Sequence, residues 1–424
     1  MKNIVAFLII CLLFYGVVST VDASDWPQWR GPEKDGISRE TGLLKEWPDG
    51  GPQVLWRVPL GEGFSGISVV DKRIYSMFSE GDDEFVVCLN ASNGEEIWRF
   101  RSDSNYIESM GGNGPRATPT IDGELLFTVT AQGKLYALNT ENGEKVWSHD
   151  LKGEFGSKIP RWGSCTSPLV EGDLLLVEVG GTDGKSIVAF DKKNGDIVWN
   201  SHTDILGYSS PIAVTIGGIR QLIVFTGTQL VSVSPENGQL YWTYPWQTEY
   251  DVNAATPVFI PPDKIFISSG YGKGAAVVQV SVMASTESNA EEDEGEKSHA
   301  EIQVEQIWKN EKMKNHFATS VLHDDYLYGF DNAILKCIDA STGMEKWKTR
   351  GYGKGTLMLA DAHLIILSDR GKLGLAEATP SGYIEVASAE ILSGLCWTVP
   401  TLANGKLYAR NEKEMVCLDI TGQN

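Results

Sequence analysis

Cysteine and histidine are scarce in this sequence, and neither residue type forms a recognisable motif. The 424 residues include six cysteines and six histidines. No two cysteines are adjacent, and none has the C-x-x-C spacing of zinc, haem or redox motifs. The G-x-S-x-G, H-E-x-x-H and P-loop motifs are absent as well. These absences argue against a hydrolase, and we assign no catalytic residue and no metal ligand from motifs.

Positive charge is also in the minority. The chain carries 36 lysines and arginines against 56 aspartates and glutamates, which gives a formal net charge of −20. A surface of this sign repels nucleic acids and anionic lipids, because both are densely negative. We therefore expect no nucleic-acid partner, and we expect the charge to keep the protein soluble.

Long apolar runs are missing outside the first residues of the chain. Residues 4–18 are apolar, follow a short basic start, and precede Val21 and Ala23 at the −3 and −1 positions of a cleavage site. This pattern predicts a signal peptide over residues 1–23, cleaved after Ala23, and a secreted or periplasmic protein. The run is shorter than the roughly 20 residues that span a bilayer, and the alternative is an uncleaved anchor helix. Cys11 lacks the preceding small residue of a lipoprotein site.

What the sequence does contain is a repeated turn followed by tryptophan. The pattern Asp/Asn-Ala-x-x-Gly-x-x-x-Trp, complete or degenerate, returns along the chain. The tryptophans at the ends of these copies are Trp56, Trp98, Trp147, Trp199, Trp242, Trp308 and Trp347. An eighth copy falls near Val386, with its tryptophan lost. Because most intervals are about 40–50 residues, the repeat predicts the four-stranded blade of a β-propeller.

One blade can be predicted strand by strand from its turns. Strands are expected over residues 116–121, 124–130, 134–139 and 144–149, with glycine-containing turns between them. The tryptophan of each outer strand is large enough to fill the gap between neighbouring blades.

The two ends of the repeat array predict how the ring closes. The last repeat stops after its turn at residues 419–422, and residues 53–58 form a strand without a partner nearby in sequence. Pairing the two removes both exposed edges. We therefore predict an all-β, eight-bladed propeller of a single domain over residues 24–424. An acidic insertion over residues 284–301, without apolar periodicity, is expected to be a disordered tip in the fifth blade.

The cysteines left after cleavage are odd in number and cannot all pair. We expect mostly buried free thiols that act as small apolar fillers at equivalent strand positions. They are Cys88, Cys165, Cys337, Cys396 and Cys417.

The repeat resembles those of quinoprotein propellers, which include pyrroloquinoline-quinone (PQQ) dehydrogenases and BamB-like proteins of outer-membrane assembly. Segments 25–32, 114–119, 251–257 and 352–355 are similar to a secreted PQQ-like family common in planctomycetes. The resemblance covers nearly the whole mature chain and implies the fold rather than an activity.

Aligning the repeats places several residues near one mouth of the central channel. Arg116 and Lys354 would meet carboxylates, while Trp162 and Trp397 would stack on a ring. With Asn253, they are our candidate cofactor-binding residues for a flat anionic ligand such as PQQ. The alternative is that Arg116 pairs with an acid such as Glu108 and that the tryptophans only pack. A histidine near this mouth, His316, is expected to be a polar lining residue.

The enzyme that the resemblance allows lacks several parts. PQQ dehydrogenases bind Ca²⁺ through oxygen ligands and often carry adjacent cysteines, and here only Asn253 and Asp251 suggest a ligand and a base. We therefore expect no cofactor and predict a monomeric, non-enzymatic module that binds a protein or polymer partner at a propeller face. The alternatives are a PQQ- and Ca²⁺-dependent alcohol or sugar dehydrogenase and a sensor or carbohydrate-binding domain.

Overall fold

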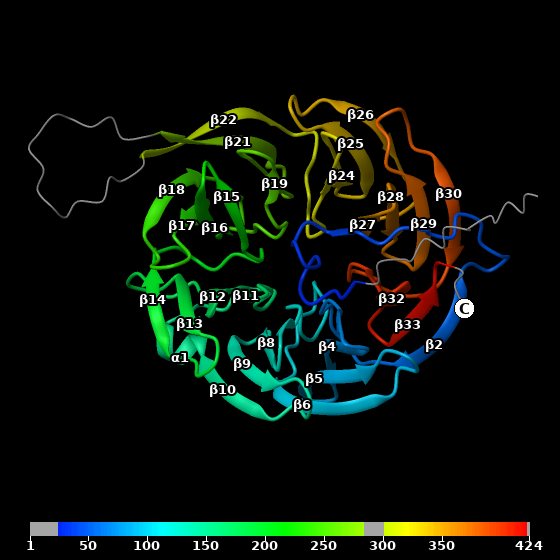
Figure 1. Cartoon of the computed structure of the whole chain (residues 1–424), viewed down its shortest axis with the longest axis horizontal. Helices are drawn as coiled ribbons and strands as arrows, with labels where there is room; N and C mark the ends of the chain where they lie inside the picture. The colour runs from blue at the N-terminus through cyan, green and yellow to red at the C-terminus, as the bar shows by residue number, and fades with distance from the viewer. Residues whose placement is uncertain (1–23, 284–300, 422–424) are drawn as a thin grey trace, which may run out of the picture.

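The chain forms a closed ring of eight β-sheets around a central channel, as predicted (Figure 1). The computed structural model describes residues 24–283 and 301–421. The predicted signal peptide and nearly all of the predicted acidic insertion lie outside these residues. No helix within the described ranges is long and apolar enough to cross a membrane.

Each sheet is one blade, with its first strand at the channel and its last at the rim. Blade 1 contains β3 (Ser68–Val70), β4 (Arg73–Glu80), β5 (Asp83–Asn90) and β6 (Glu96–Ser104). Blade 2 contains β7 (Thr120–Asp122), β8 (Leu125–Val129), β9 (Lys134–Asn139) and β10 (Lys145–Asp150), followed by the short helix α1 (Leu151–Phe155). Blade 3 contains β11 (Leu169–Glu171), β12 (Leu174–Glu178), β13 (Ile187–Asp191) and β14 (Ile197–Ser201). Blade 4 contains β15 (Ile212–Ile216), β16 (Ile219–Phe225), β17 (Gln229–Val233) and β18 (Leu240–Pro245).

The second half of the ring repeats this order. Blade 5 contains β19 (Val258–Ile260), β20 (Lys264–Ser269), β21 (Gly274–Met283) and β22 (Glu301–Asn310). Blade 6 contains β23 (Val321–His323), β24 (Tyr326–Asp331), β25 (Ile334–Asp339) and β26 (Glu345–Thr349). Blade 7 contains β27 (Thr356–Ala360), β28 (His363–Leu367), β29 (Lys372–Glu377) and β30 (Glu385–Glu390), and β1 (Ile37–Ser38) pairs with its inner strand. Blade 8 contains β31 (Thr401–Ala403), β32 (Lys406–Arg410), β33 (Glu414–Asp419) and β2 (Gln53–Pro59).

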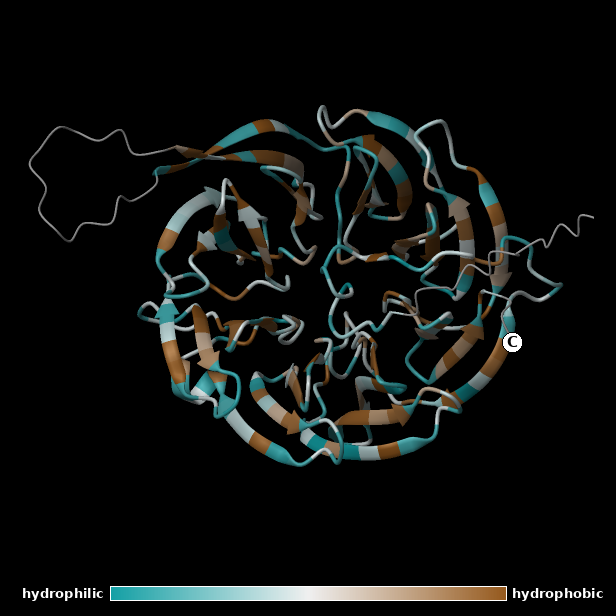
Figure 2. Ribbon diagram, viewed as in Figure 1, coloured by the Kyte–Doolittle hydropathy of each residue, from teal (hydrophilic) through white to brown (hydrophobic). Residues whose placement is uncertain are grey.

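The two middle strands of each blade are almost wholly buried, whereas the outer strands alternate. Strands β12 and β13 are apolar throughout their interiors because both faces pack against neighbouring blades. Outer strands show bands of apolar and polar residues along the rim of the disc (Figure 2). The inner strands are shorter than the sequence suggested: β7 begins at Thr120, so Arg116 lies in the preceding connection rather than in a strand.

The repeated tryptophans lie between blades, which confirms their predicted role. Each is buried, and most donate the indole N–H to a backbone carbonyl in the turn of the next blade over 2.7–3.1 Å. The turn glycine of that blade packs on the ring: a Cβ on Gly143 would lie 2.5 Å from Trp98. Trp242 differs, because its indole donates to Gln221 of its own blade. The position without tryptophan falls on Ala387 of β30, which pairs with Leu375, and Val386 is the bulge residue before it.

The ring closes as predicted by pairing β2 with β33. The register joins Gln53 to Asp419 and Pro59 to Glu414, so the first and last parts of the chain share blade 8. Arg410 of this blade is fully buried and crosses to blade 1, where it donates to the carbonyl oxygens of Met77 and Gly61. The closing seam is therefore held by backbone pairing and by a buried guanidinium.

A second set of contacts, which the sequence analysis did not anticipate, joins the blades around the channel. Serine and threonine hydroxyls in the inner strands and their connections bond to the backbone of a neighbouring blade at most seams. Examples are Ser65 to Ala117, Thr120 to Pro168, Ser209 to Ala255, Thr356 to Thr398 and Thr401 to Ile67. Each bond satisfies a polar group that the narrow channel would otherwise leave buried and unpaired.

The segment from residue 24 to residue 40, which we call the plug, enters the centre of the ring and contacts inner strands of blades 1 and 7 (Figure 1). Trp26 bridges to Val69 in blade 1, and β1 pairs with β27 in blade 7. The guanidinium of Arg30, fully buried, donates to the carbonyl of Ser320 before blade 6. The plug therefore occupies part of the channel and is held there by contacts with three blades.

The five cysteines among the described residues are free, as expected. Cys88, Cys337 and Cys417 occupy equivalent positions in β5, β25 and β33. Cys165 and Cys396 lie instead in connections before inner strands, so the prediction of equivalent strand positions is wrong for these two.

Candidate functional site

A cavity of about 450 Å³ lies at the mouth of the channel. Most of its wall comes from the connections that lead into the inner strands, and Trp29 of the plug forms part of its floor. Its size falls within the usual range of small-molecule and side-chain pockets. The lining includes Phe64, Met110, Arg116, Trp162, Cys165, Tyr208, Tyr271, His316, Phe317, Lys354 and Trp397.

Aromatic rings form a nearly continuous belt around this cavity. Neighbouring rings lie 5.1–6.4 Å apart between centroids, in mostly tilted arrangements that suit their quadrupoles. In order around the wall, they are Phe64, Trp397, Phe317, His316, Tyr271, Trp162 and Tyr208. The belt gives the cavity an apolar interior with flat faces.

Four of the five predicted site residues line this one cavity: Arg116, Trp162, Lys354 and Trp397. Trp162 stacks on Tyr271 with 23° between the ring planes, and Trp397 lies between Phe64 and Phe317. The structure thus brings together side chains from blades that are distant in sequence. Whether they bind a ligand remains a prediction.

Arg116 is held by backbone carbonyls. Its guanidinium donates to the carbonyl oxygens of Gly114, Gly111 and Gly112. The acid suggested as its alternative partner, Glu108, lies 3.9 Å from Arg161 and accepts bonds from nearby backbone N–H groups. The positive charge of Arg116 therefore has no ion-pair partner among the described residues.

Lys354 brings a second cation to the cavity. Its backbone N–H bonds to Asp369, but its ammonium forms no ion pair within the described parts of the chain. Burial and the charge of Lys354 lower the pKa of His316 to about 4, so the imidazole is neutral at physiological pH. No aspartate or glutamate belongs to the described residues that line the cavity. The site is apolar with a net positive charge, although the whole protein is acidic.

Asn253 is placed differently from the other predicted residues. Its side chain is fully buried, and its amide donates to the carbonyls of Thr226, Gly227 and Trp246 while its oxygen accepts from Ser269. Both N–H groups of the amide are used in these bonds. Asn253 therefore holds the connection in place and does not line the cavity.

The carboxylates around the mouth do not form a cation site. No group of three or more His, Cys, Asp or Glu side chains suited to a metal occurs in residues 24–283 or 301–421. Asp251, the suggested base, bonds to Gln247 and is absent from the cavity lining. These residues do not fit a calcium ion held in the manner of quinoprotein dehydrogenases.

Several features of the site escaped the sequence analysis. Tyr208, Tyr271 and Phe64 lie in irregular connections, where no period indicates the direction of a side chain. Trp29 belongs to a segment noted only for its family resemblance. A usable signal was the concentration of aromatic residues just before the inner strands, which the tryptophan repeat does not explain.

Three exposed apolar side chains, which together we call the rim patch, lie in connections that border the mouth. They are Ile107 and Met110, before blade 2, and Tyr250, before blade 5, with exposed fractions of 70%, 66% and 59%. Met110 also lines the cavity, and Tyr250 packs edge-on against Tyr271. Exposed apolar side chains therefore stand on two sides of the cavity mouth.

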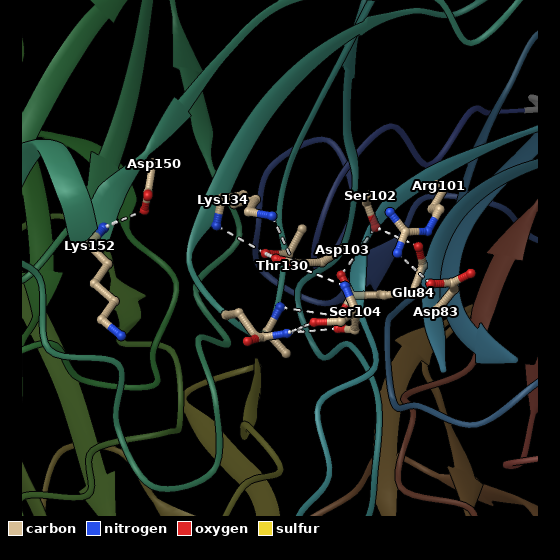
Figure 3. A network of polar contacts seen from close by, with 12 residues as sticks. Asp83, Glu84, Arg101, Ser102, Asp103, Ser104, Thr130, Lys134, Asp150 and Lys152 are labelled. Carbon is tan, nitrogen blue, oxygen red and sulfur yellow. Dashed lines mark hydrogen bonds and ion pairs between the residues drawn. The ribbon is translucent and has the colours of Figure 1, made fainter. Parts of the chain in front are cut away.

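Behind the mouth, a polar network joins blades 1 and 2 (Figure 3). Asp103 accepts bonds from Thr130 and Lys134 of blade 2, each over 3.0 Å. Glu84, fully buried, accepts from Ser102 and from the N–H of Ala131. Burial raises the pKa of Glu84 from about 4.5 to about 8, and the charge of Asp103 adds to the shift. Glu84 is therefore largely protonated at neutral pH.

This protonation predicts a specific pH dependence. Because the pKa of Glu84 is higher in the folded than in the unfolded state, its contribution to stability is present below about pH 4.5 and is lost as pH rises to about 8. Glu84→Gln removes this titration. The free energy of unfolding of Glu84→Gln minus that of the wild type should therefore increase by roughly 2–4 kcal/mol between pH 5 and pH 8. Urea unfolding of both proteins at the two pH values measures it, and a constant difference would contradict the assignment.

A family model described as outer membrane protein assembly factor BamB matches residues 82–349. The chain is similar to BamB from Moraxella catarrhalis, with a TM-score of 0.58 and 14% identity over 87% of this chain and 99% of that one. It is also similar to quinohemoprotein alcohol dehydrogenase from Comamonas testosteroni, with a TM-score of 0.61 and 10% identity over 94% and 81% of the respective chains. Identities this low show the fold alone. No curated protein matches the sequence.

Proposed function

Because the chain belongs to the family of the outer membrane protein assembly factor BamB, we propose that it is a non-enzymatic, exported scaffold that binds a protein partner on its open face. The single observation that carries the proposal is the rim patch beside the aromatic cavity. Together they offer a central pocket with apolar surroundings, the arrangement in which a few side chains supply most of the binding energy of an interface. The ring of blades holds the connections that line the cavity in fixed positions.

Met110 provides a sharp test, because the chain contains a methionine of equal exposure elsewhere. Met344 is also 66% exposed but follows the outer turn of blade 6, away from the mouth. We expect Met110→Ser to reduce capture of the partner at least about fivefold, since it removes apolar contact at the pocket edge. Affinity capture from extracts of the source organism, quantified by mass spectrometry, compares wild type, Met110→Ser and Met344→Ser. If the wild type, Met110→Ser and Met344→Ser capture the same proteins in equal amounts, the partner does not bind at this face.

A second candidate is a PQQ-dependent oxidoreductase, favoured by the flat aromatic cavity with Arg116 and Lys354. PQQ is a planar carboxylate, and Trp162 and Trp397 supply faces on which it could stack. The calcium that accompanies it in quinoprotein dehydrogenases finds no matching set of ligands here. We therefore rank it below the scaffold. PQQ titration with and without Ca²⁺, repeated on Arg116→Ala, decides between them.

A further inference from the structure

We infer that the open cavity receives an acidic and apolar segment of the partner protein, with a carboxylate of that segment bound by the ammonium of Lys354. This inference rests on the proposed scaffold function and specifies the chemistry of the partner. It is argued from the charge inside the cavity, from its aromatic wall and from the apolar surface around it.

The cavity wall carries two cations that form no ion pair within the described residues. Arg116 and Lys354 both line the cavity, neither has an ion-pair partner among the described residues, and no carboxylate belongs to the described lining. Arg116 is already bonded to three carbonyls, whereas the ammonium of Lys354 retains its donors. A carboxylate beside Lys354 would form a charge-assisted hydrogen bond against an aromatic wall, and such bonds are stronger than those between neutral groups.

The titratable groups near Lys354 leave its ammonium without an ion pair. His316 stays neutral at physiological pH and adds no competing charge. Asp369 is engaged by the backbone N–H of Lys354 and not by its ammonium. The remaining wall is formed largely by aromatic rings, so the rest of the bound group should be apolar.

The extent of the apolar surface distinguishes a protein segment from a small molecule. A ligand that fills about 450 Å³ would leave Ile107 and Tyr250 uncovered, because neither belongs to the cavity lining. A peptide whose acidic residue enters the cavity can cover them with flanking apolar side chains. Trp29 of the plug belongs to the lining of the cavity, so we expect the segment to bind by insertion of a side chain or a short loop.

A displayed library of random 12-residue peptides, panned on the purified full chain, tests this inference directly. We expect the enriched peptides to carry Asp or Glu next to aromatic or aliphatic residues, and to bind more weakly as salt is raised. Lys354→Met keeps the length of the side chain but removes its charge, and it should weaken binding at least tenfold. Lys312→Met, an exposed lysine in the connection before the inner strand of blade 6, should leave the affinity unchanged.

The possible failures are distinguishable. Peptides without acidic enrichment, or peptides that bind Lys354→Met as tightly as wild type, overturn the inference but leave the scaffold function standing. Binding of a small carboxylate such as benzoate in a Lys354-dependent way, with no peptide enriched, makes the cavity a small-molecule site and also overturns it. If the wild-type chain neither enriches peptides nor captures a protein, the proposed function fails as well.

Discussion

A chain that begins at residue 60 should not fold into a closed ring. Without residues 53–59, blade 8 loses its outer strand and exposes the edge of β33, and the seam toward blade 1 loses Trp56. A ring shares its stability among all blades, so an open seam leaves two sheet edges and an unfilled interface. We expect loss of near-ultraviolet circular dichroism, loss of a cooperative unfolding transition, and aggregation seen by gel filtration.

Moving the closing strand to the other end of the chain provides the matched control. Because Gln53 pairs with Asp419, the start of β2 lies beside the end of β33, and residues 420–424 are available as a turn. A chain of residues 60–424 followed by residues 53–59 should therefore recover cooperative unfolding, although it lacks the plug. If the relocated strand does not restore cooperative unfolding, then the plug, and not the paired strand, closes the ring.

Trp147→Ala should lower the free energy of unfolding by about 3–5 kcal/mol, the usual cost of emptying a buried aromatic site. The indole lies between Phe127 of its own blade and Phe190 of the next, and donates to the carbonyl of Lys192 over 3.1 Å. A Cβ on Gly195 would lie 2.8 Å from it, so the neighbouring turn is fitted to the ring and cannot fill the space easily. Denaturant unfolding measures the loss.

The adjacent residue supplies the control for this variant. Val146 precedes Trp147 in β10, but it is 48% exposed at the rim. Val146→Ala changes the same strand without opening a seam and should alter the free energy of unfolding by less than about 0.5 kcal/mol. Similar losses in both variants would mean that the strand, and not the interblade indole, determines stability.

The number of blades and the closure of the ring followed from the sequence because they rest on local chemistry that repeats. Each tryptophan fills a gap between blades, so its spacing marks the blades even where Ala387 replaces it. The strand that contains Trp56 has no partner nearby in sequence, and the last repeat lacks its outer strand. Pairing these two is the arrangement that removes both exposed edges. The position of Arg116 and Lys354 at the mouth followed from the same alignment.

The site itself was decided by the tertiary structure. Asn253 turns inward to bind three carbonyls, and Tyr208 and Tyr271 turn toward the channel, although all three lie in connections where no period fixes the direction of a side chain. The plug occurs once in the chain, and its bond to Ser320 joins residues 290 positions apart, so no repeat could reveal it. The sequence repeat thus predicted the closed ring of blades, because each copy packs against the same kind of neighbour. The floor, wall and charge of the cavity depend on unrepeated segments that only the closed ring brings together.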